Sequence, residues 1–379
     1  MAFPNGWTRS CPMVIQHTQV TGSLTDYPVA INHASFIANC PEILTTGDAN
    51  AAQADGGDIR FSSDVGGCVQ LPCEVVDWTQ NATPSLATAE IHVGGTAPDS
   101  AGDVTIYPWW KAGGGKTQPA ATDPFGARAV WPSSHRVVHH FGSSATFSGL
   151  DSTGNYGVCT PSGGASVCIG KLGGGIGFAN NGQMASLDFL TFLTSASRIT
   201  LSLWCNLATY LGQGMCMFTC GPGAGGGTFE DINLMLTTSH IAGFGVDNGN
   251  DGSGYYTLDP RGVWHQFVLV FDGTLTGDAN RLKVYDQGVQ QSLTFTDTVP
   301  ATTPGPQTNY ELNHYNDTTW SSIAQEDEFR GLNVALSADW IATEYANQNS
   351  PGTFIIAGTP YTVSSWHCGG ADPWLWVMT

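Results

Sequence analysis

Two glutamates in the last quarter of the chain come closest to a catalytic pair. Glu326 and Glu328 lie two residues apart in segment 325–330, so both side chains would share one face of a regular strand. Some glycoside hydrolases place a nucleophile and a general acid on alternate positions of such a strand. Here the spacing differs from that pattern and its third carboxylate is missing. We therefore predict no catalytic residues and no enzyme activity, with a glycoside hydrolase or polysaccharide lyase as the less favoured alternative.

The chain contains ten cysteines, and an even, high count favours disulfide bonds in an oxidising environment. Cys68 with Cys73, and Cys159 with Cys168, are close enough in sequence to staple one turn each, although sequence cannot fix the pairing. The disulfide candidates are Cys11, Cys40, Cys68, Cys73, Cys159, Cys168, Cys205, Cys216, Cys220 and Cys368.

Residues 1–7 have neither the basic nor the apolar region of a secretory signal, which conflicts with an oxidising destination. Bacteriophage virion proteins resolve this conflict, because they fold in the host cytoplasm and reach the outside by lysis. We therefore predict localisation on a virion, with a secreted or cell-surface protein as the alternative.

Aromatic side chains in loop-like contexts could stack on sugar rings, and Trp320, Tyr255 and Tyr256 are our carbohydrate-binding candidates. We instead expect Trp109 and Trp110 to fill an interface between domains. A third group, Trp366, Trp374 and Trp376, lies close to the C-terminal end and predicts a tail that docks on the protein itself or on a neighbour.

Composition excludes two classes of partner. The chain has 12 Lys and Arg against 31 Asp and Glu, a formal net charge of −19, and no run of basic residues. Nucleic acid and anionic membranes both attract clustered cations, so we expect neither as a partner. No stretch approaches the roughly 20 consecutive apolar residues of a membrane span.

The 379 residues, with 48 Gly and 20 Pro, are typical of two domains of short strands and tight turns. Apolar and polar residues alternate with period two in segments 58–62, 89–93 and 199–207, as in half-buried strands. One helix is expected over residues 337–345, with Ser337 as N-cap and Asp339 in the first turn.

The N-terminal part resembles the small β domain family DUF2341. The matching segments are 6–7, 25–29, 56–61, 70–72 and 104–110. Cys73 stands where that family usually has an aromatic residue.

The remainder resembles the laminin-G-like, concanavalin A-like jelly roll that commonly follows DUF2341. The matching segments are 129–131, 138–141, 151–155, 170–174, 276–285, 327–330 and 337–345. Such sandwiches often hold a structural calcium ion through a strand aspartate, and the resemblance implies Asp327 for that role; no other cofactor is expected.

The resemblance implies an all-β chain: a small β-sandwich domain over residues 1–118, a linker over 119–133, a jelly roll over 134–358 with one short C-terminal helix, and a tail over 359–379. Paired modules of this kind also resemble bacteriophage virion-associated proteins. We therefore predict a non-catalytic virion structural or adhesion protein of the capsid, neck or tail. We expect it to be stabilised by disulfides and homo-oligomeric, with other virion or surface proteins as partners. The alternative is a secreted carbohydrate-binding surface protein.

Overall fold

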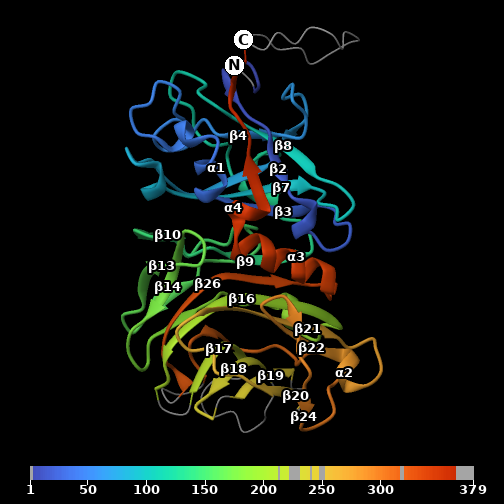
Figure 1. Cartoon of the computed structure of the whole chain (residues 1–379). Helices are drawn as coiled ribbons and strands as arrows, with labels where there is room; N and C mark the ends of the chain where they lie inside the picture. The colour runs from blue at the N-terminus through green and yellow to red at the C-terminus, as the bar shows by residue number, and fades with distance from the viewer. Residues whose placement is uncertain are drawn as a thin grey trace. The chain divides into compact units, whose positions relative to one another are not determined.

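The computed structural model describes residues 3–211, 214–221, 231–239, 241–246, 252–315 and 320–363. They form two compact units, which are described separately (Figure 1). Unit 1 comprises residues 1–132 and 346–379, and unit 2 comprises residues 133–345. The strands of both units pair antiparallel, and strand is far more abundant than helix, which confirms the predicted all-β class.

Unit 1 contains a seven-stranded and a three-stranded sheet. The larger has the order β27-β2-β8-β1-β28, with β4 pairing β8 and β5. Its strands are β1 (Arg9–Ser10), β2 (Met13–Ile15), β4 (Arg60–Ser62), β5 (Gln70–Leu71), β8 (Val104–Trp110), β27 (Ile355–Ala357) and β28 (Tyr361–Thr362). The smaller has the order β3-β7-β6, from β3 (Tyr27–Asn32), β6 (Cys73–Thr79) and β7 (Thr88–Thr96).

The units divide the chain differently from the predicted domains. Strands β27 and β28 pair with β2 and β1, so the segment after the long helix belongs to unit 1 and not to the jelly roll. Residues 119–132, predicted as a linker, also belong to unit 1. The physical reason is strand pairing: the N–H and C=O groups of β1 and β2 need partners that local sequence does not supply.

Unit 2 contains two eight-stranded sheets and a small hairpin. One sheet has the order β12-β15-β25-β17-β18-β19-β20-β24, and the other has the order β13-β14-β26-β16-β21-β22-β23, with β9 pairing β26. The first comprises β12 (Thr160–Ser162), β15 (Met184–Ser186), β17 (Gly214–Gly221), β18 (Ile232–Thr237), β19 (Ile241–Val246), β20 (Ser253–Thr257), β24 (Thr294–Phe295) and β25 (Asn309–Leu312). The second comprises β9 (His135–His139), β13 (Ser166–Ile169), β14 (Gly174–Phe178), β16 (Arg198–Thr209), β21 (Trp264–Asp272), β22 (Leu282–Asp286), β23 (Val289–Gln290) and β26 (Ile323–Leu332). The hairpin is β10 (Gly142–Ser143) with β11 (Thr146–Phe147).

The two large sheets of unit 2 pack face to face and enclose its core. Phe218 of β17 stacks on Phe329 of β26 at a ring-centroid distance of 5.3 Å. Phe244 of β19 lies 6.1 Å from Phe267 of β21. The period-two pattern of segment 199–207 places alternate leucines of β16 in this core, which is how the sequence encodes the sandwich.

Helices are few and short apart from α3 (Ala338–Asn349). The Trp340 N–H donates to Ser337 Oγ at 3.2 Å, which confirms Ser337 as the N-cap. The other α-helices are α1 (Ala34–Ile37), α2 (Asp278–Arg281) and α4 (Pro351–Phe354). The 3-10 helices are η1 (His17–Gln19), η2 (Pro41–Leu44), η3 (Pro84–Leu86), η4 (Ala127–Val130) and η5 (Thr191–Leu193).

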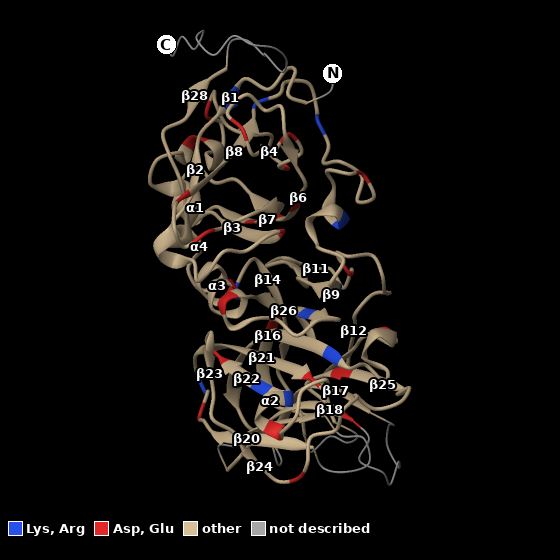
Figure 2. Ribbon diagram, turned by 90° about the vertical axis from the view of Figure 1, so that its right-hand side faces the viewer, with Lys and Arg blue, Asp and Glu red and all other residues tan. Residues whose placement is uncertain are grey.

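Charged side chains are sparse on both units (Figure 2). No helix among the described residues is both long and apolar enough to cross a bilayer.

Candidate functional site

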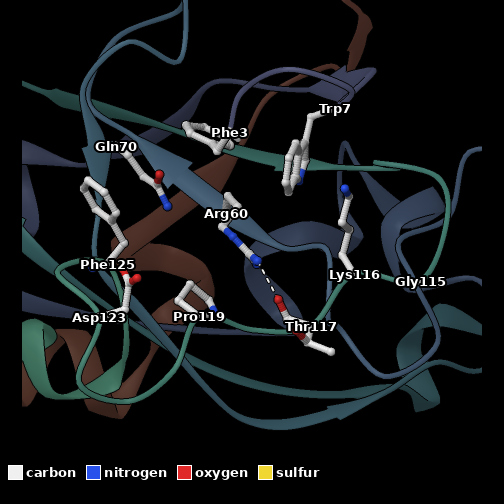
Figure 3. Close-up of a pocket in the computed structure, with 10 residues that line it drawn as sticks. All are labelled: Phe3, Trp7, Arg60, Gln70, Gly115, Lys116, Thr117, Pro119, Asp123 and Phe125. Carbon is white, nitrogen blue, oxygen red and sulfur yellow. Dashed lines mark hydrogen bonds between the residues drawn. The ribbon is translucent and has the colours of Figure 1, made fainter. Parts of the chain in front are cut away.

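Unit 1 contains an open pocket of about 360 Å³ (Figure 3). That volume falls within the roughly 300–1,000 Å³ of typical small-ligand sites. The pocket combines three aromatic rings, two cations, one carboxylate and one side-chain amide. It is lined by Phe3, Trp7, Arg60, Gln70, Gly115, Lys116, Thr117, Pro119, Asp123 and Phe125.

Neighbouring strands and one long loop position these side chains. Arg60 lies on β4 and Gln70 on β5, and β4 is also paired with β8. The loop is fastened to unit 1 at Lys116, whose N–H donates to Gln53 Oε1 at 2.8 Å and whose carbonyl accepts from Gln53 Nε2 at 2.7 Å. Gly57 permits this approach, because a Cβ there would lie 2.2 Å from the Lys116 carbonyl oxygen.

Three backbone carbonyls fix the guanidinium of Arg60. Its Nη1 donates to Gly57 at 3.1 Å and to Ile59 at 2.7 Å, and its Nη2 donates to Thr117 at 2.6 Å. Figure 3 shows the last of these bonds at the pocket wall. Burial lowers the pKa of the Arg60 guanidinium from its ordinary value, against the smaller raising effect of nearby acidic groups.

Both cations of the pocket gather on one aromatic ring. The Arg60 Cζ lies 5.5 Å and the Lys116 Nζ 5.3 Å from the centroid of a Trp7 ring, within the range of cation–π attraction. Trp7 is held by an edge-to-face contact with Phe3, at 5.4 Å, and by a hydrogen bond from its Nε1 to the Asp58 carbonyl. The Trp7 ring therefore stabilises both positive charges by cation–π attraction.

The opposite side of the pocket carries Gln70, Asp123 and Phe125. Asp123 Oδ1 accepts a hydrogen bond from the Phe125 N–H at 2.9 Å, which shapes the turn that presents the phenyl ring. Phe125 is 36% exposed and Gln70 is partly exposed, so both can meet a ligand.

The three predicted carbohydrate-binding aromatics do not form one platform. Tyr255 and Tyr256 are successive residues of β20 and point to opposite faces of the sheet. Tyr256 faces the core, where its ring stacks on Phe244 at 6.1 Å. Trp320 lies beside Gly214 of β17, three strands away from β20 in the same sheet. Glycan binding at these residues stays a prediction.

The predicted domain-interface tryptophans are bound inside unit 1. Trp109 is buried and its Nε1 donates to Ser62 Oγ at 2.7 Å. Trp110 is also buried, and its Nε1 donates to the Asn50 carbonyl at 2.7 Å. Both rings are therefore part of the core of unit 1, and their hydrogen-bond partners lie in the same unit.

The carboxylate of Asp327, the predicted calcium ligand, is bound by backbone amides. Its Oδ2 accepts from the N–H groups of Lys171 and Leu172, at 2.7 and 2.9 Å. Its Oδ1 accepts from the Glu328 N–H at 2.7 Å. Asp327 thus fastens the loop after β13 to β26. Both oxygens already have protein donors, and calcium at this residue stays a prediction.

Glu326 and Glu328 do not share a face, contrary to the expectation for a regular strand. A register shift opposite segment 202–204 of β16 interrupts β26 here, and Glu328 adopts a φ of +52°. Glu326 is buried beside core cysteines, while Glu328 pairs with His140 and Arg330. The bulge therefore removes the geometry of a carboxylate pair.

Eight of the disulfide candidates are free thiols: Cys11, Cys40, Cys73, Cys159, Cys168, Cys205, Cys216 and Cys220. The two local pairings suggested by sequence are therefore absent among these described residues, because strand pairing directs Cys73 and Cys168 elsewhere. Cys68 is disulfide-bonded, and its bond to Cys73 that the sequence suggested is excluded because Cys73 is a free thiol. Cys368 and the tail candidates Trp366, Trp374 and Trp376 lie outside the described residues.

Sequence reasoning did not single out the pocket residues. It used Trp7 and Arg60 only as parts of the segments that resemble DUF2341. One signal in the sequence could have led to them: with only 12 Lys and Arg in the chain, each cation is a candidate for a specific role. Only the fold, however, brings residues 7, 60 and 116 together.

No family model matches the chain, and no curated protein matches it. Among solved structures, the receptor-binding domain of botulinum neurotoxin type G matches with a TM-score of 0.41 and 12% identity, over 57% of this chain and 52% of that one. The binding domain of Paraclostridial Mosquitocidal Protein 1 matches with a TM-score of 0.43 and 11% identity, over 56% and 52%. The matched part of each of these two structures is thus about half its length.

A third structure is domain 4 of a GH43 extracellular arabinanase from Geobacillus stearothermophilus, in complex with arabinotriose. It matches with a TM-score of 0.39 and 21% identity, over 56% of this chain and 98% of that one. At these scores the likeness assigns neither a family nor a function to this chain.

Proposed function

We propose that this protein is a non-catalytic binding protein whose unit 1 pocket holds a sugar unit of a surface glycan. The observation that carries the proposal is the lining of the pocket, which sets an exposed phenyl ring beside an amide and two cations. Sugars present apolar C–H faces and hydroxyl groups, so they are recognised by aromatic faces together with polar donors and acceptors.

We propose a non-catalytic role because the pocket lacks a pair of carboxylates among the residues that the structure describes. Glycoside hydrolysis ordinarily requires two carboxyl groups about 5–10 Å apart on either side of the scissile bond. Among the described residues that line the pocket, Asp123 is the one carboxylate. Binding by stacking and hydrogen bonds needs no cofactor, and the proposal includes none.

A glycan array, followed by affinity measurements on the best ligand, tests the proposal. Phe125→Ala should weaken binding about tenfold or more, as expected for loss of an aromatic anchor. Phe189→Ala is the matched control, because Phe189 is a similarly exposed phenylalanine in unit 2, at 42% against 36%. Equal effects of the two substitutions, or no glycan bound by the wild-type protein, would contradict the proposal.

We further propose a bacteriophage particle as the setting, with a secreted surface protein as the alternative. The support is the resemblance of the sequence to DUF2341 and laminin-G-like modules. Antibodies against the protein should label purified particles in electron micrographs, and sedimentation should show a homo-oligomer. Protein found only in particle-free culture medium would favour the secreted alternative.

A further inference from the structure

We propose that the pocket binds the carboxylate of an acidic sugar, with Arg60 and Lys116 holding the negative charge. This inference rests on the proposed glycan binding and narrows the ligand to sugar acids such as uronates and sialates.

Neither Arg60 nor Lys116 forms an ion pair with an acidic side chain that the structure describes. Among the described residues, no carboxylate oxygen lies within 4.0 Å of the Arg60 or Lys116 nitrogens, whereas other arginines are paired. Examples of such pairs are Arg9 with Glu42, Arg198 with Asp272, and Arg261 with Asp259. Acidic residues outnumber basic ones 31 to 12 in this chain. Two cations without an ion pair in the described part of the chain are therefore unexpected, and they are available to bind an anionic ligand.

The side chains that line the pocket carry a net positive charge. The two cations and Asp123 leave one positive charge in the pocket. Arg60 is only 6% exposed and forms no ion pair among the described residues, although Asp58 and Asp123 lie near enough to raise its pKa. A ligand with a single negative charge would neutralise the net charge of the residues that line the pocket. A doubly charged phosphate would add more negative charge than the pocket can neutralise, and Asp123 would repel it.

Hydrogen bonds to the backbone fix the orientation of the Arg60 guanidinium. The bonds to Gly57, Ile59 and Thr117 use three of the five N–H donors of Arg60 and hold the group in one orientation. Its Nε–H and one Nη2–H have no acceptor among the described residues. A planar, preoriented guanidinium is well matched to the two oxygens of a carboxylate.

The remaining lining suits the sugar that carries the carboxylate. Trp7 is 3% exposed, so its ring backs the cations and does not offer a stacking face. Phe125 offers that face, and the Gln70 amide can both donate to and accept from ring hydroxyls. The pocket thus has a cationic part, formed by Arg60 and Lys116, and a second part in which Phe125 and Gln70 can contact the sugar ring.

Affinity electrophoresis of the full chain tests the inference, in native gels that contain polygalacturonate or polysialic acid. Fully methyl-esterified polygalacturonate is the matched neutral polymer, because it keeps the backbone and removes the charge. We expect retardation by at least one acidic polymer, at least tenfold weaker retardation by the methyl ester, and at least tenfold weaker acid binding for Lys116→Gln. Lys116→Arg should retain binding.

Arg128→Gln is the control for net charge, since Arg128 is an exposed cation of unit 1 that does not line the pocket. Its retardation should match that of wild type, and the melting temperatures of all variants establish that they are folded. Binding that falls equally for Arg128→Gln and Lys116→Gln would overturn the inference. So would equal retardation by dextran sulfate, which would assign the site to anions in general.

The two proposals fail differently. Binding of neutral glycans that is lost in Phe125→Ala but unchanged in Lys116→Gln would overturn the carboxylate inference and leave glycan binding intact. Binding of no glycan, acidic or neutral, would overturn both.

Discussion

Glu326 and Cys205 lie directly opposite each other on the neighbouring strands β26 and β16, and both are buried. Neither carboxyl oxygen of Glu326 has a hydrogen-bond partner among the described residues. Burial raises the pKa of Glu326 well above its ordinary value. Burial therefore favours the protonated, neutral form of this carboxyl.

The stability of the protein should consequently depend on pH through Glu326. The folded state keeps the proton above about pH 4.3, where the unfolded chain loses it. Because the folded state then binds more protons, this group lowers the free energy of unfolding as pH rises, by up to about 1.4 kcal/mol per pH unit until its folded pKa is reached. Urea denaturation across pH 4–8 should give a flatter profile for Glu326→Gln than for wild type.

Glu326→Leu provides an independent check, because leucine has a similar size and cannot ionise. Both variants should show the same reduction in the slope of the free energy of unfolding against pH, even if their stabilities at any one pH differ. Profiles parallel to wild type in both variants would show that Glu326 does not titrate in this window.

Arg330 is expected to be essential to the stability of unit 2. It pairs with Glu328, and its Nη1 lies 3.5 Å from Glu344 of α3. Arg330→Met would leave two buried carboxylates without their cation, at a cost of about 3–5 kcal/mol in the free energy of unfolding. Thermal or urea denaturation measures this loss.

Arg198→Met is the matched control for that prediction. Arg198 pairs with Asp272 at 3.0 Å, but its side chain is 50% exposed, so we expect a change of less than about 1 kcal/mol. Similar losses for the two substitutions would argue against a special role for the buried network.

Asp327 should stabilise unit 2 through its backbone hydrogen bonds. Asp327→Ala removes the acceptor of the Lys171, Leu172 and Glu328 N–H groups, and we expect a loss of about 2–4 kcal/mol. The wild-type melting temperature should be the same in excess calcium and in a chelator. A lower melting temperature in the chelator, abolished by Asp327→Ala, would instead establish the calcium site suggested by sequence resemblance.

Cys11 and Cys40 should form a disulfide bond under mild oxidation. Both thiols are free and buried, and Cys40 lies near enough to Cys11 to contribute to the raised pKa of its thiol. Burial raises the pKa of Cys11 well above its ordinary value, so the reaction should be slow at neutral pH and faster at alkaline pH. Peptide mapping by mass spectrometry after oxidation would identify the cross-link.

Cys205 is the control thiol, because it is also free and buried, and its sulfur contacts the Met215 sulfur at 3.8 Å. It should remain unpaired under the same conditions. A cross-link that forms only after denaturation would contradict the predicted proximity of Cys11 and Cys40.

The sequence by itself determined the strand content, the two-part organisation and the one long helix. Period-two patterns such as segment 199–207 report which face of a strand is buried, and Ser337 with Asp339 marks a helix start, because both signals are local. For the same reason, composition alone was enough to argue against nucleic acid as a partner.

The tertiary structure alone decided which distant residues meet. The return of β27 and β28 to unit 1 depends on pairing across more than 300 residues, and the bulge that separates Glu326 from Glu328 depends on the register of β26 against β16. The pocket likewise joins Trp7, Arg60 and Lys116 through hydrogen bonds from strand to loop. Such contacts carry no period or motif along the chain, since they arise from long-range packing.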